Sequence, residues 1–240
     1  MLIALYLLLA VFIGMLAAMF GLGGGFLIVP VLTLAGVPIH HAVGTSSFII
    51  VFSSLSAIVG YSRQKKIEYG TGIMLAIPSI VGAYLGAYAT VFIDAHVLKI
   101  IFAFVLVIVA VKMAKNNESV RVRINKKVIP FGGFAAGIAS GLLGVGGGII
   151  NVPFLSYTGL SIHSAVATSS FSIFFSSFTA SIKHFLLGNI EPLWAAIFIP
   201  GIIIGAQIGA RVAVKIKAKN LKTAFAVFLI ILAILMILRA

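Results

Sequence analysis

Cysteine is absent from the 240-residue chain, which excludes disulfide bonds, thiolate metal ligands and thiol nucleophiles. Acidic residues number only 4, and charged residues make up 9% of the chain, against about a quarter in a typical soluble domain. The sequence also has no HExxH motif, no P-loop and no paired aspartates in an apolar segment. Hydrolysis and phosphoryl transfer therefore lack their usual reagents, and we expect no enzyme, no cofactor and no metal site.

Hydrophobic residues fill most of the chain instead, at 62%. Runs of this length, without the short alternation of strands, favour membrane helices over an outer-membrane barrel. The first run has no basic start and no typical cleavage site, so we interpret it as a spanning helix rather than a signal peptide. The segments that reach the roughly 20 residues needed to cross a bilayer are about 1–20, 44–61, 70–92, 97–113, 193–214 and 221–238.

The net charge of +13 does not indicate a nucleic-acid partner. Lysine and arginine gather in short clusters between apolar segments, which is typical of cytoplasmic loops under the positive-inside rule. The sequence therefore predicts a multi-pass protein of the inner cell membrane, with the lipid bilayer as its surroundings. Nothing in the sequence indicates an oligomeric state.

The chain contains an internal duplication. An offset of 123 positions aligns 14–113 with 137–236 without a gap, and roughly 40 of the 100 pairs are identical. The densest match pairs HHAVGTSSFIIVFSS at 40–54 with HSAVATSSFSIFFSS at 163–177. We therefore divide the chain into a first repeat at 1–114, a basic linker at 115–127 and a second repeat at 128–240.

The basic clusters predict opposite orientations for the two repeats. The loop at 62–68 and the linker are both basic, so both should be cytoplasmic. In the second repeat the bias is reversed, because 185–191 has no lysine or arginine and 211–222 has five. Inversion requires an odd number of crossings per repeat. We predict an all-α protein with about five segments per repeat, including a short or re-entrant pair, which gives 8 full-length helices and up to 10 segments.

Each repeat is interrupted by the same glycine-rich decapeptide, GLGGGFLIVP at 21–30 and GVGGGIINVP at 144–153. Three consecutive glycines make a poor helix interior and a good place to unwind one. Unwound backbone at membrane depth lines a cavity or is buried in protein, so two inverted breaks indicate a site near the bilayer midplane. Close helix packing is the alternative. We favour the break for the glycine triplets, and packing for Gly82, Gly86, Gly205 and Gly209.

Helix starts at the breaks suit an anion, because their first amides are unpaired and their dipoles favour negative charge. The TSS triads at 45–47 and 168–170 are expected to open the next helices as caps and donors, although such hydroxyls often bond only to helix backbone. Four helix starts would then converge on one anion. The candidate binding residues are Gly23, Gly24, Gly25, Thr45, Ser46, Ser47, Gly146, Gly147, Gly148, Asn151, Thr168, Ser169 and Ser170.

These motifs resemble those of the TauE/SafE family of sulfite exporters and anion permeases. The resemblance rests on the two decapeptides, on HHAVGTSS with HSAVATSS, and on PSIVGAYLGA with PGIIIGAQIGA, and it covers nearly the whole chain. It implies an inner-membrane transporter of small anions such as sulfite, sulfonates including sulfoacetate, or carboxylates. It does not imply which anion is carried or in which direction.

An asymmetric ligand should be held by residues that the duplication does not repeat. Asn151 replaces Ile28 beside the second break and is the first candidate, with a bond to neighbouring backbone as the alternative. Lys183 and His184 replace Gly60 and Tyr61 near the outer end of a helix, where we expect long cations to snorkel rather than bind.

Other polar residues are candidates for gating or proton exchange. His40 and His163 are duplicated beside the triads and are expected to cap helices, with proton exchange as the alternative. Gln207 replaces Tyr84, and Arg211 opens a basic run that should set orientation. Glu68 and Glu191 are expected at helix starts, where a carboxylate complements the dipole. The gating or proton-linked candidates are His40, His163, Lys183, His184 and Gln207.

The sequence therefore favours a secondary transporter of a small anion that works by alternating access. An anion channel with a glycine-lined filter and a carboxylate permease are the alternatives.

Overall fold

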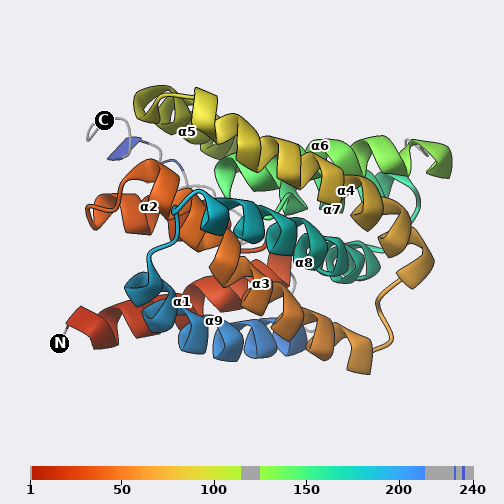
Figure 1. The fold of residues 1–240 in the computed structure, drawn as a ribbon. Helices are drawn as coiled ribbons and strands as arrows, with labels where there is room; N and C mark the ends of the chain where they lie inside the picture. The colour runs from red at the N-terminus through yellow and green to blue at the C-terminus, as the bar shows by residue number, and fades with distance from the viewer. Residues whose placement is uncertain (1, 115–124, 214–229, 231–233, 236–240) are drawn as a thin grey trace.

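The computed structural model describes residues 2–114, 125–213, 230 and 234–235, and within these ranges the chain is helical without strands (Figure 1). The predicted all-α class is confirmed. The helices are α1 (Leu2–Phe20), α2 (Gly25–Leu34), α3 (Ile39–Arg63), α4 (Tyr69–Ala89), η1 (Thr90–Phe92), α5 (Ala95–Ala114), η2 (Lys126–Val128), α6 (Ile129–Leu143), α7 (Gly148–Tyr157), α8 (Ile162–Leu186) and α9 (Pro192–Val212).

The duplication is visible in the helix boundaries. Helices α2, α3 and α4 begin and end 123 residues before α7, α8 and α9. Helix α1 corresponds to α6 and is longer at its start. The predicted counterpart of α5, at 221–238, lies almost wholly outside the described residues. The observed helices thus repeat in the order that the sequence duplication predicts.

The first two helices of each repeat form a re-entrant hairpin. In the second repeat, Gly132 near the start of α6 packs on Phe154 near the end of α7, and Gly147 packs on Ala136. The two helices therefore run antiparallel. Helix α7 has 10 residues, about 15 Å of helix, which is half the thickness of a bilayer core. The sequence left open whether these segments cross or re-enter, and in the structure α7 runs back toward the end of the molecule at which α6 begins.

The two repeats interlock through parallel helix pairs. A side chain on Gly201, Gly205 or Gly209 of α9 would meet backbone of Leu7, Val11 or Met15 of α1. In the same way Gly82 and Gly86 of α4 pack on Phe134 and Ile138 of α6. The predicted packing role of Gly82, Gly86, Gly205 and Gly209 is confirmed.

Equivalent helices run in opposite directions. Helix α3 lies parallel to α9, since Ser56 bonds to Ile203 and Gln64 to Ala210. Helix α8 lies parallel to α4, and α3 and α4 form an antiparallel hairpin. Helices α3 and α8 therefore run antiparallel to each other at the centre of the molecule (Figure 1).

Helix lengths match a bilayer for most segments. Four described helical stretches are long and apolar enough to cross one: Ile39–Arg63, Tyr69–Phe92, Ile162–Leu186 and Pro192–Val212. Helices α1 and α5 have 19 and 20 residues, whereas α6 has only 15. The predicted eighth long helix, at 221–238, lies almost wholly outside the described residues.

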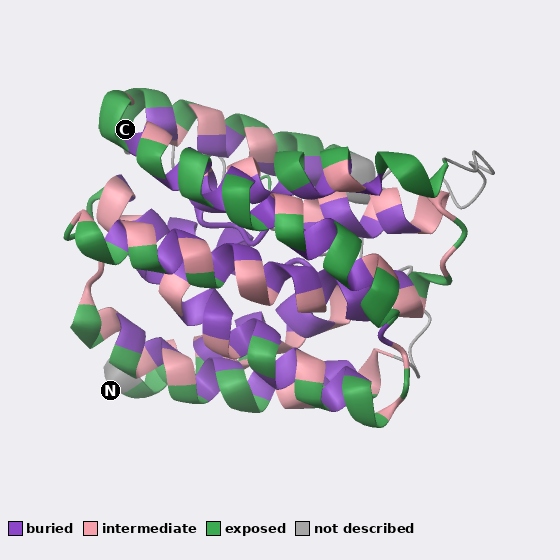
Figure 2. Ribbon diagram, turned by 45° about the vertical axis from the view of Figure 1, so that its right-hand side comes forward, coloured by how far each residue is buried: buried purple, intermediate pink, exposed green. Residues whose placement is uncertain are grey.

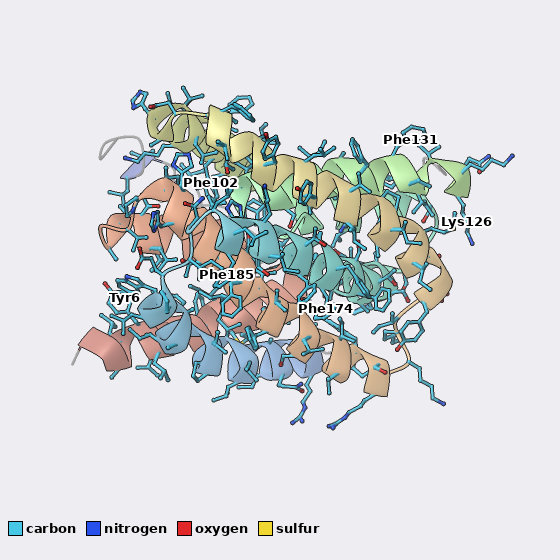
Figure 3. The ribbon with its side chains drawn as sticks, viewed as in Figure 1. Tyr6, Phe102, Lys126, Phe131, Phe174 and Phe185 are labelled. Atoms are coloured by element: carbon cyan, nitrogen blue, oxygen red, sulfur yellow. The ribbon has the colours of Figure 1, made fainter. Side chains whose placement is uncertain are left out.

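Burial and charge fit this arrangement. The buried residues lie along the central helices, and exposed residues cover the outer faces of the surrounding ones (Figure 2). Arg63, Lys126 and Arg211 belong to helix ends at one end of the molecule, where Lys126 extends in Figure 3. The cleft lined by His40 and Asp94 lies at the opposite end.

Candidate anion site at two glycine turns

Each re-entrant hairpin turns at the glycine motif. Helix α1 ends at Phe20 and α2 begins at Gly25, while α6 ends at Leu143 and α7 begins at Gly148. The turns use left-handed backbone at Gly21, Gly23 and Gly24 and at Gly144, Gly146 and Gly147, with φ between 63° and 94°. Residues with a Cβ avoid this region, which is why glycine is required here. The predicted helix breaks are confirmed.

The two turns meet at the centre of the molecule. A Cβ on Gly23 would lie 3.3 Å from the Cα of Gly146, and one on Gly146 would lie 3.4 Å from the Cα of Gly23. Gly25 and Gly148 are already helical, and a side chain on them would collide with the carbonyl oxygens of Gly144 and Gly21 respectively. The third glycine of each triplet is therefore needed for close contact between the repeats.

The serines at the centre of the TSS triads tie the turns together. Ser46 Oγ of α3 donates to the Gly144 carbonyl at 2.8 Å, and Ser169 Oγ of α8 donates to the Gly21 carbonyl at 3.0 Å. Each serine thus crosses to the turn of the other repeat. Because each hydroxyl proton is already donated, neither is available to an anion in this arrangement.

The threonines of the triads make a second reciprocal pair of bonds. Thr45 Oγ1 accepts from the backbone N–H of Glu191 at 2.8 Å, and Thr168 Oγ1 accepts from that of Glu68 at 3.0 Å. Glu68 and Glu191 are the N-cap residues of α4 and α9, as their predicted place at helix starts requires. The threonines therefore attach α3 to the start of α9 and α8 to the start of α4.

The prediction that the triads open helices is wrong. Helix α3 begins at Ile39 and α8 at Ile162, so both triads lie more than one turn inside. Ser161 caps α8 by accepting from the N–H of Ser164. Only α2 and α7 begin at the glycine turns, so four helix starts do not converge. We predicted the starts of α3 and α8 too late because the continuous apolar run begins only after each triad.

The remaining triad serines differ between the repeats. Ser170 Oγ donates to the Val166 carbonyl of its own helix at 3.0 Å. Ser47 Oγ is buried and has no partner among the described residues. The triads therefore lie beside the turns, but most of their hydroxyl groups form hydrogen bonds to backbone groups.

The space at the turns is closed in this structure. The cavity beside Gly24 has a volume of about 10 Å³ and is lined by apolar atoms. That is about the space of one water molecule, so an oxyanion does not fit without movement. The glycine turns are thus a contact between repeats here, and an open site requires their separation.

Asn151 lies four residues after Gly147, the last positive-φ glycine of the second turn. It lies in the first turn of α7, its N–H bonds to the Gly147 carbonyl, and its side chain is 1% exposed. Its Oδ1 atom has no partner among the described residues. The alternative of a bond to neighbouring backbone is thus not seen for this oxygen, and Asn151 keeps its place as a candidate.

His184 does not reach toward the surface. Its ring is fully buried, and Nε2 bonds to the carbonyl of Gly141 in α6 at 2.9 Å. Tyr61, its counterpart, makes the equivalent bond to Ala18 of α1 at 2.7 Å. The prediction of snorkelling is therefore wrong for His184, because the packing of α8 on α6 encloses it.

Lys183 takes a different direction from its neighbour. Its Nζ lies 5.2 Å from the ring centre of Tyr84 and 4.6 Å from that of Tyr88, both on α4. These cation–π contacts hold the ammonium against the flank of α4. The lysine thus joins α8 to α4.

The other candidates have structural partners. His40 Nε2 lies 3.0 Å from the Ile93 carbonyl, and Gln207 Nε2 donates to the Ser56 carbonyl at 2.9 Å. His40 and His163 are each the second residue of a helix, and the N-caps are Pro38 and Ser161, so the predicted capping by histidine is wrong. Arg211 is exposed in the last turn of α9.

A polar cleft was missed from the sequence. It has a volume of about 490 Å³ and is lined by His40, Thr90, Asp94 and Asn189, among others. Its residues come from α3, from the η1 to α5 connection and from the α8 to α9 loop. Only the folded arrangement joins these segments, and the presence of polar residues in three separate segments was the sole signal available.

Comparisons with known proteins match one family and relatives that are named as membrane transporters or as members of that family. A family model described as Sulfite exporter TauE/SafE matches residues 6–236. A probable membrane transporter protein of Methanocaldococcus jannaschii is 31% identical over 99% of this chain and 96% of its own length. The probable membrane transporter protein YunE of Bacillus subtilis is 28% identical over 91% of each chain. Sulfite exporter TauE/SafE family protein 1 of Arabidopsis thaliana is 34% identical over 48% of this chain and 26% of its own length. No solved structure matches.

Proposed function

The chain belongs to the Sulfite exporter TauE/SafE family, and we propose that it is a secondary transporter of small anions, with sulfur oxyanions and organosulfonates as its substrates. The observation that carries this proposal is the meeting of two oppositely directed glycine turns, each followed directly by a helix start. Helices α2 and α7 begin there, and their first amides and dipoles favour negative charge. A transporter of this type binds its substrate near the bilayer midplane.

The closed turns are consistent with one state of an alternating-access cycle. The bonds from Ser46 to Gly144 and from Ser169 to Gly21 are equivalent. Opening the turns toward either side of the membrane would therefore break the same kind of contact. Rocking of one repeat against the other would open the turns to each side in succession. In this proposal the cleft beside His40 is the path to one side.

Charge supports an orientation. The end of the molecule that carries Arg63, Lys126 and Arg211 is the basic end, and we place it in the cytoplasm of a cell with the chain in the inner membrane. The linker at 115–127 then lies in the cytoplasm. The cleft beside Asp94 and Asn189 opens to the outside.

Transport by the purified protein in lipid vesicles tests the proposal. We expect saturable uptake of sulfite, thiosulfate, sulfate or sulfoacetate, accelerated by unlabelled anion on the opposite side. Such counterflow distinguishes a transporter from a channel, and acetate serves as the carboxylate comparison. The same anions should raise the thermal midpoint by mass action. Vesicles without protein give the background, and neither flux nor a thermal shift with any of these anions would refute the proposal.

A further inference from the structure

Four of the six buried polar side-chain atoms without a hydrogen-bond partner in the described residues belong to the second repeat, and the other two are Ser47 Oγ and Gln64 Oε1 of the first. Among the described residues, Ser140 Oγ, Asn151 Oδ1, Ser177 Oγ and His184 Nδ1 are buried and without a hydrogen-bond partner, and all four side chains are at most 1% exposed. Their counterparts are Ala17, Ile28, Ser54 and Tyr61. Unpaired buried polar atoms are costly, so four within one repeat call for a ligand rather than for packing.

The first repeat shows what the same positions look like when satisfied. The Tyr61 hydroxyl donates to the Ala18 carbonyl, and Ser54 Oγ donates to the Ile50 carbonyl at 2.7 Å. Alanine and isoleucine at the other two positions have no polar atom to satisfy. The polar atoms of the second repeat are therefore not required by the fold that both repeats share.

These residues follow one face of α8 and the adjoining hairpin. Ile173 of α8 would touch a Cβ on Gly146 at 3.1 Å, and His184 bonds to Gly141. Ser177 lies between these two contacts on the same helical face, one turn from Ile173 and two from His184. Ser140 directly precedes Gly141, and Asn151 bonds through its backbone to Gly147. Ser140, Asn151 and His184 thus lie on or against the second hairpin, and Ser177 lies on the face of α8 that Ile173 and His184 turn toward it.

The hydrogen bond of His184 determines where its proton is. A carbonyl oxygen only accepts, so the Nε2 atom that contacts Gly141 must carry the proton. In the neutral ring Nδ1 is then a bare acceptor, buried and without a partner. This atom is free to take a second proton from a solution that reaches it.

A positive charge on His184 would be the only side-chain charge buried in the described interior. No lysine, arginine, aspartate or glutamate is buried among the described residues. Moving an anion from water into such surroundings is expensive unless an opposite charge accompanies it. Histidine is the side chain that gains a positive charge most readily near neutral pH, and His184 is the buried histidine of the described interior.

The titratable groups on the helices around α8 are few. From α3, His40 lines the outer cleft with Asp94, and the Tyr61 hydroxyl donates to the Ala18 carbonyl. From α4, Tyr84 and Tyr88 contact Lys183, the residue beside His184 on α8. Helix α6 carries no titratable side chain, α7 carries only Tyr157 at its far end, and Tyr6 of α1 packs on Trp194.

We propose that Ser140, Asn151 and Ser177 bind the transported anion at the second glycine turn, and that His184 takes up a proton at Nδ1 when the anion binds. This inference rests on the proposed function and adds its coupling ion. The proton comes from the solution that enters by the outer cleft, and it returns to solution when the anion leaves. Anion and proton therefore cross together, and the proton offsets one negative charge of the anion.

The pH dependence of anion binding tests this proton. Methanesulfonate and sulfate keep their charge from roughly pH 5.5 to 8.5, the range in which a histidine titrates, whereas sulfite itself takes up a proton. Because the complex holds one proton more than the free protein, affinity for these probes should fall about tenfold per pH unit between the histidine pKa of the free protein and the higher histidine pKa of the complex. Calorimetry in buffers of different ionisation enthalpy should report about one proton taken up per anion.

Two substitutions separate the charge from the packing. His184→Tyr installs the residue of the first repeat and keeps a donor for Gly141, and His184→Gln keeps a smaller donor. Both should bind anion with an affinity that does not change with pH. His96→Gln, at an exposed histidine on the cleft side of the molecule, should keep the slope of the wild type.

The outcomes are distinct. In ¹⁵N-histidine spectra, His184 of the wild type should be neutral and protonated on Nε2 without anion, and doubly protonated with it. Binding that is independent of pH in the wild type, or a slope that survives both His184 substitutions, would overturn this inference alone. Absence of any anion binding by the wild type would overturn the proposed function, and this inference with it.

Discussion

At the scale of single residues, the triad serines are the clearest case of hydroxyl groups used for structure. Ser46 and Ser169 each donate to a carbonyl of the opposite turn and are at most 1% exposed. We expect Ser46→Ala and Ser169→Ala each to lower the stability of the protein by about 1 kcal/mol, the value of a typical hydrogen bond. Thermal midpoints in detergent measure this.

Ser156→Ala is the matched control for these serines. Its hydroxyl donates within its own helix, to the Val152 carbonyl at 2.9 Å, so no contact between repeats is lost. Its midpoint should stay close to that of the wild type. Equal losses in all three variants would show that the bonds between repeats have no special role.

Asn151 tests binding rather than stability. Asn151→Ile installs the residue that the first repeat carries at Ile28, and it removes a buried oxygen that has no partner. We therefore expect unchanged or higher stability together with at least tenfold weaker anion binding, since a lost hydrogen bond to a charged ligand is worth about 1.5–3 kcal/mol. Thermal shifts with and without anion measure both quantities, and unchanged affinity would remove Asn151 from the site.

Residue roles were predictable only in part. Asn151 stood out because the duplication exposes differences between equivalent positions. Ser140 differs from Ala17 in the same way and was overlooked, while Ser177 is conserved within the repeat as Ser54 and gave no signal. The burial of His184 was not predictable, because it depends on the packing of α6 against α8.

At the scale of helices and turns, the third glycine of each triplet is the most constrained position. Gly25 is helical and has no unusual φ, yet a Cβ there would collide with the Gly144 carbonyl. We expect Gly25→Ala to destabilise the protein by about 3 kcal/mol, the upper end for overpacking, because the contact is with backbone that cannot rotate away. Gly148→Ala should behave alike.

Gly70→Ala controls for the loss of glycine itself. Gly70 lies in the first turn of α4, and a Cβ there meets nothing within 4 Å. Alanine favours helix over glycine, so this variant should be as stable as the wild type or slightly more so. Similar midpoints for Gly25→Ala and Gly70→Ala would mean that the turns separate easily.

Helix boundaries show where a sequence pattern stops being informative. The glycine triplets predicted the breaks correctly, because three glycines are poor in a helix and six positions of the two turns have a positive φ. The starts of α3 and α8 were predicted too late, because HHAV and HSAV contain neither a proline nor a glycine that marks the boundary. Pro38 and Ser161, seven residues before the first residue of each triad, are the actual N-cap residues.

At the scale of the whole molecule, neither repeat packs as an independent unit. Helix α1 of the first repeat lies along α9 of the second, and α4 lies along α6, with glycine contacts in both pairs. Residues 1–114 and 128–240, expressed separately, should therefore be unstable in the membrane. Expressed together, they should associate and be purified as one complex.

The split also has a definite contrary outcome. Chain yield in membranes and co-purification through a tag on one half measure the effect. A first half that accumulates alone, with a thermal midpoint close to that of the intact chain, would contradict the interlocked arrangement. The duplication predicted two repeats from sequence, but it could not predict that they exchange helices, since both separate and interlocked halves satisfy the same pattern.

The opposite directions of the repeats have the most direct consequence for topology. Ala35 lies exposed in the α2 to α3 turn, and Ser161 lies exposed in the corresponding α7 to α8 turn. In an inverted pair these turns face opposite sides of the membrane, whereas in a direct repeat they face the same side. With no native cysteine in the chain, Ala35→Cys and Ser161→Cys each give a single reactive thiol. A membrane-impermeant maleimide should label Ala35→Cys in intact cells and Ser161→Cys only after permeabilisation, because positive charge places the Ser161 end in the cytoplasm. Lys126→Cys, at the basic end, should follow Ser161→Cys, and labelling of all three from one side would refute the inverted arrangement.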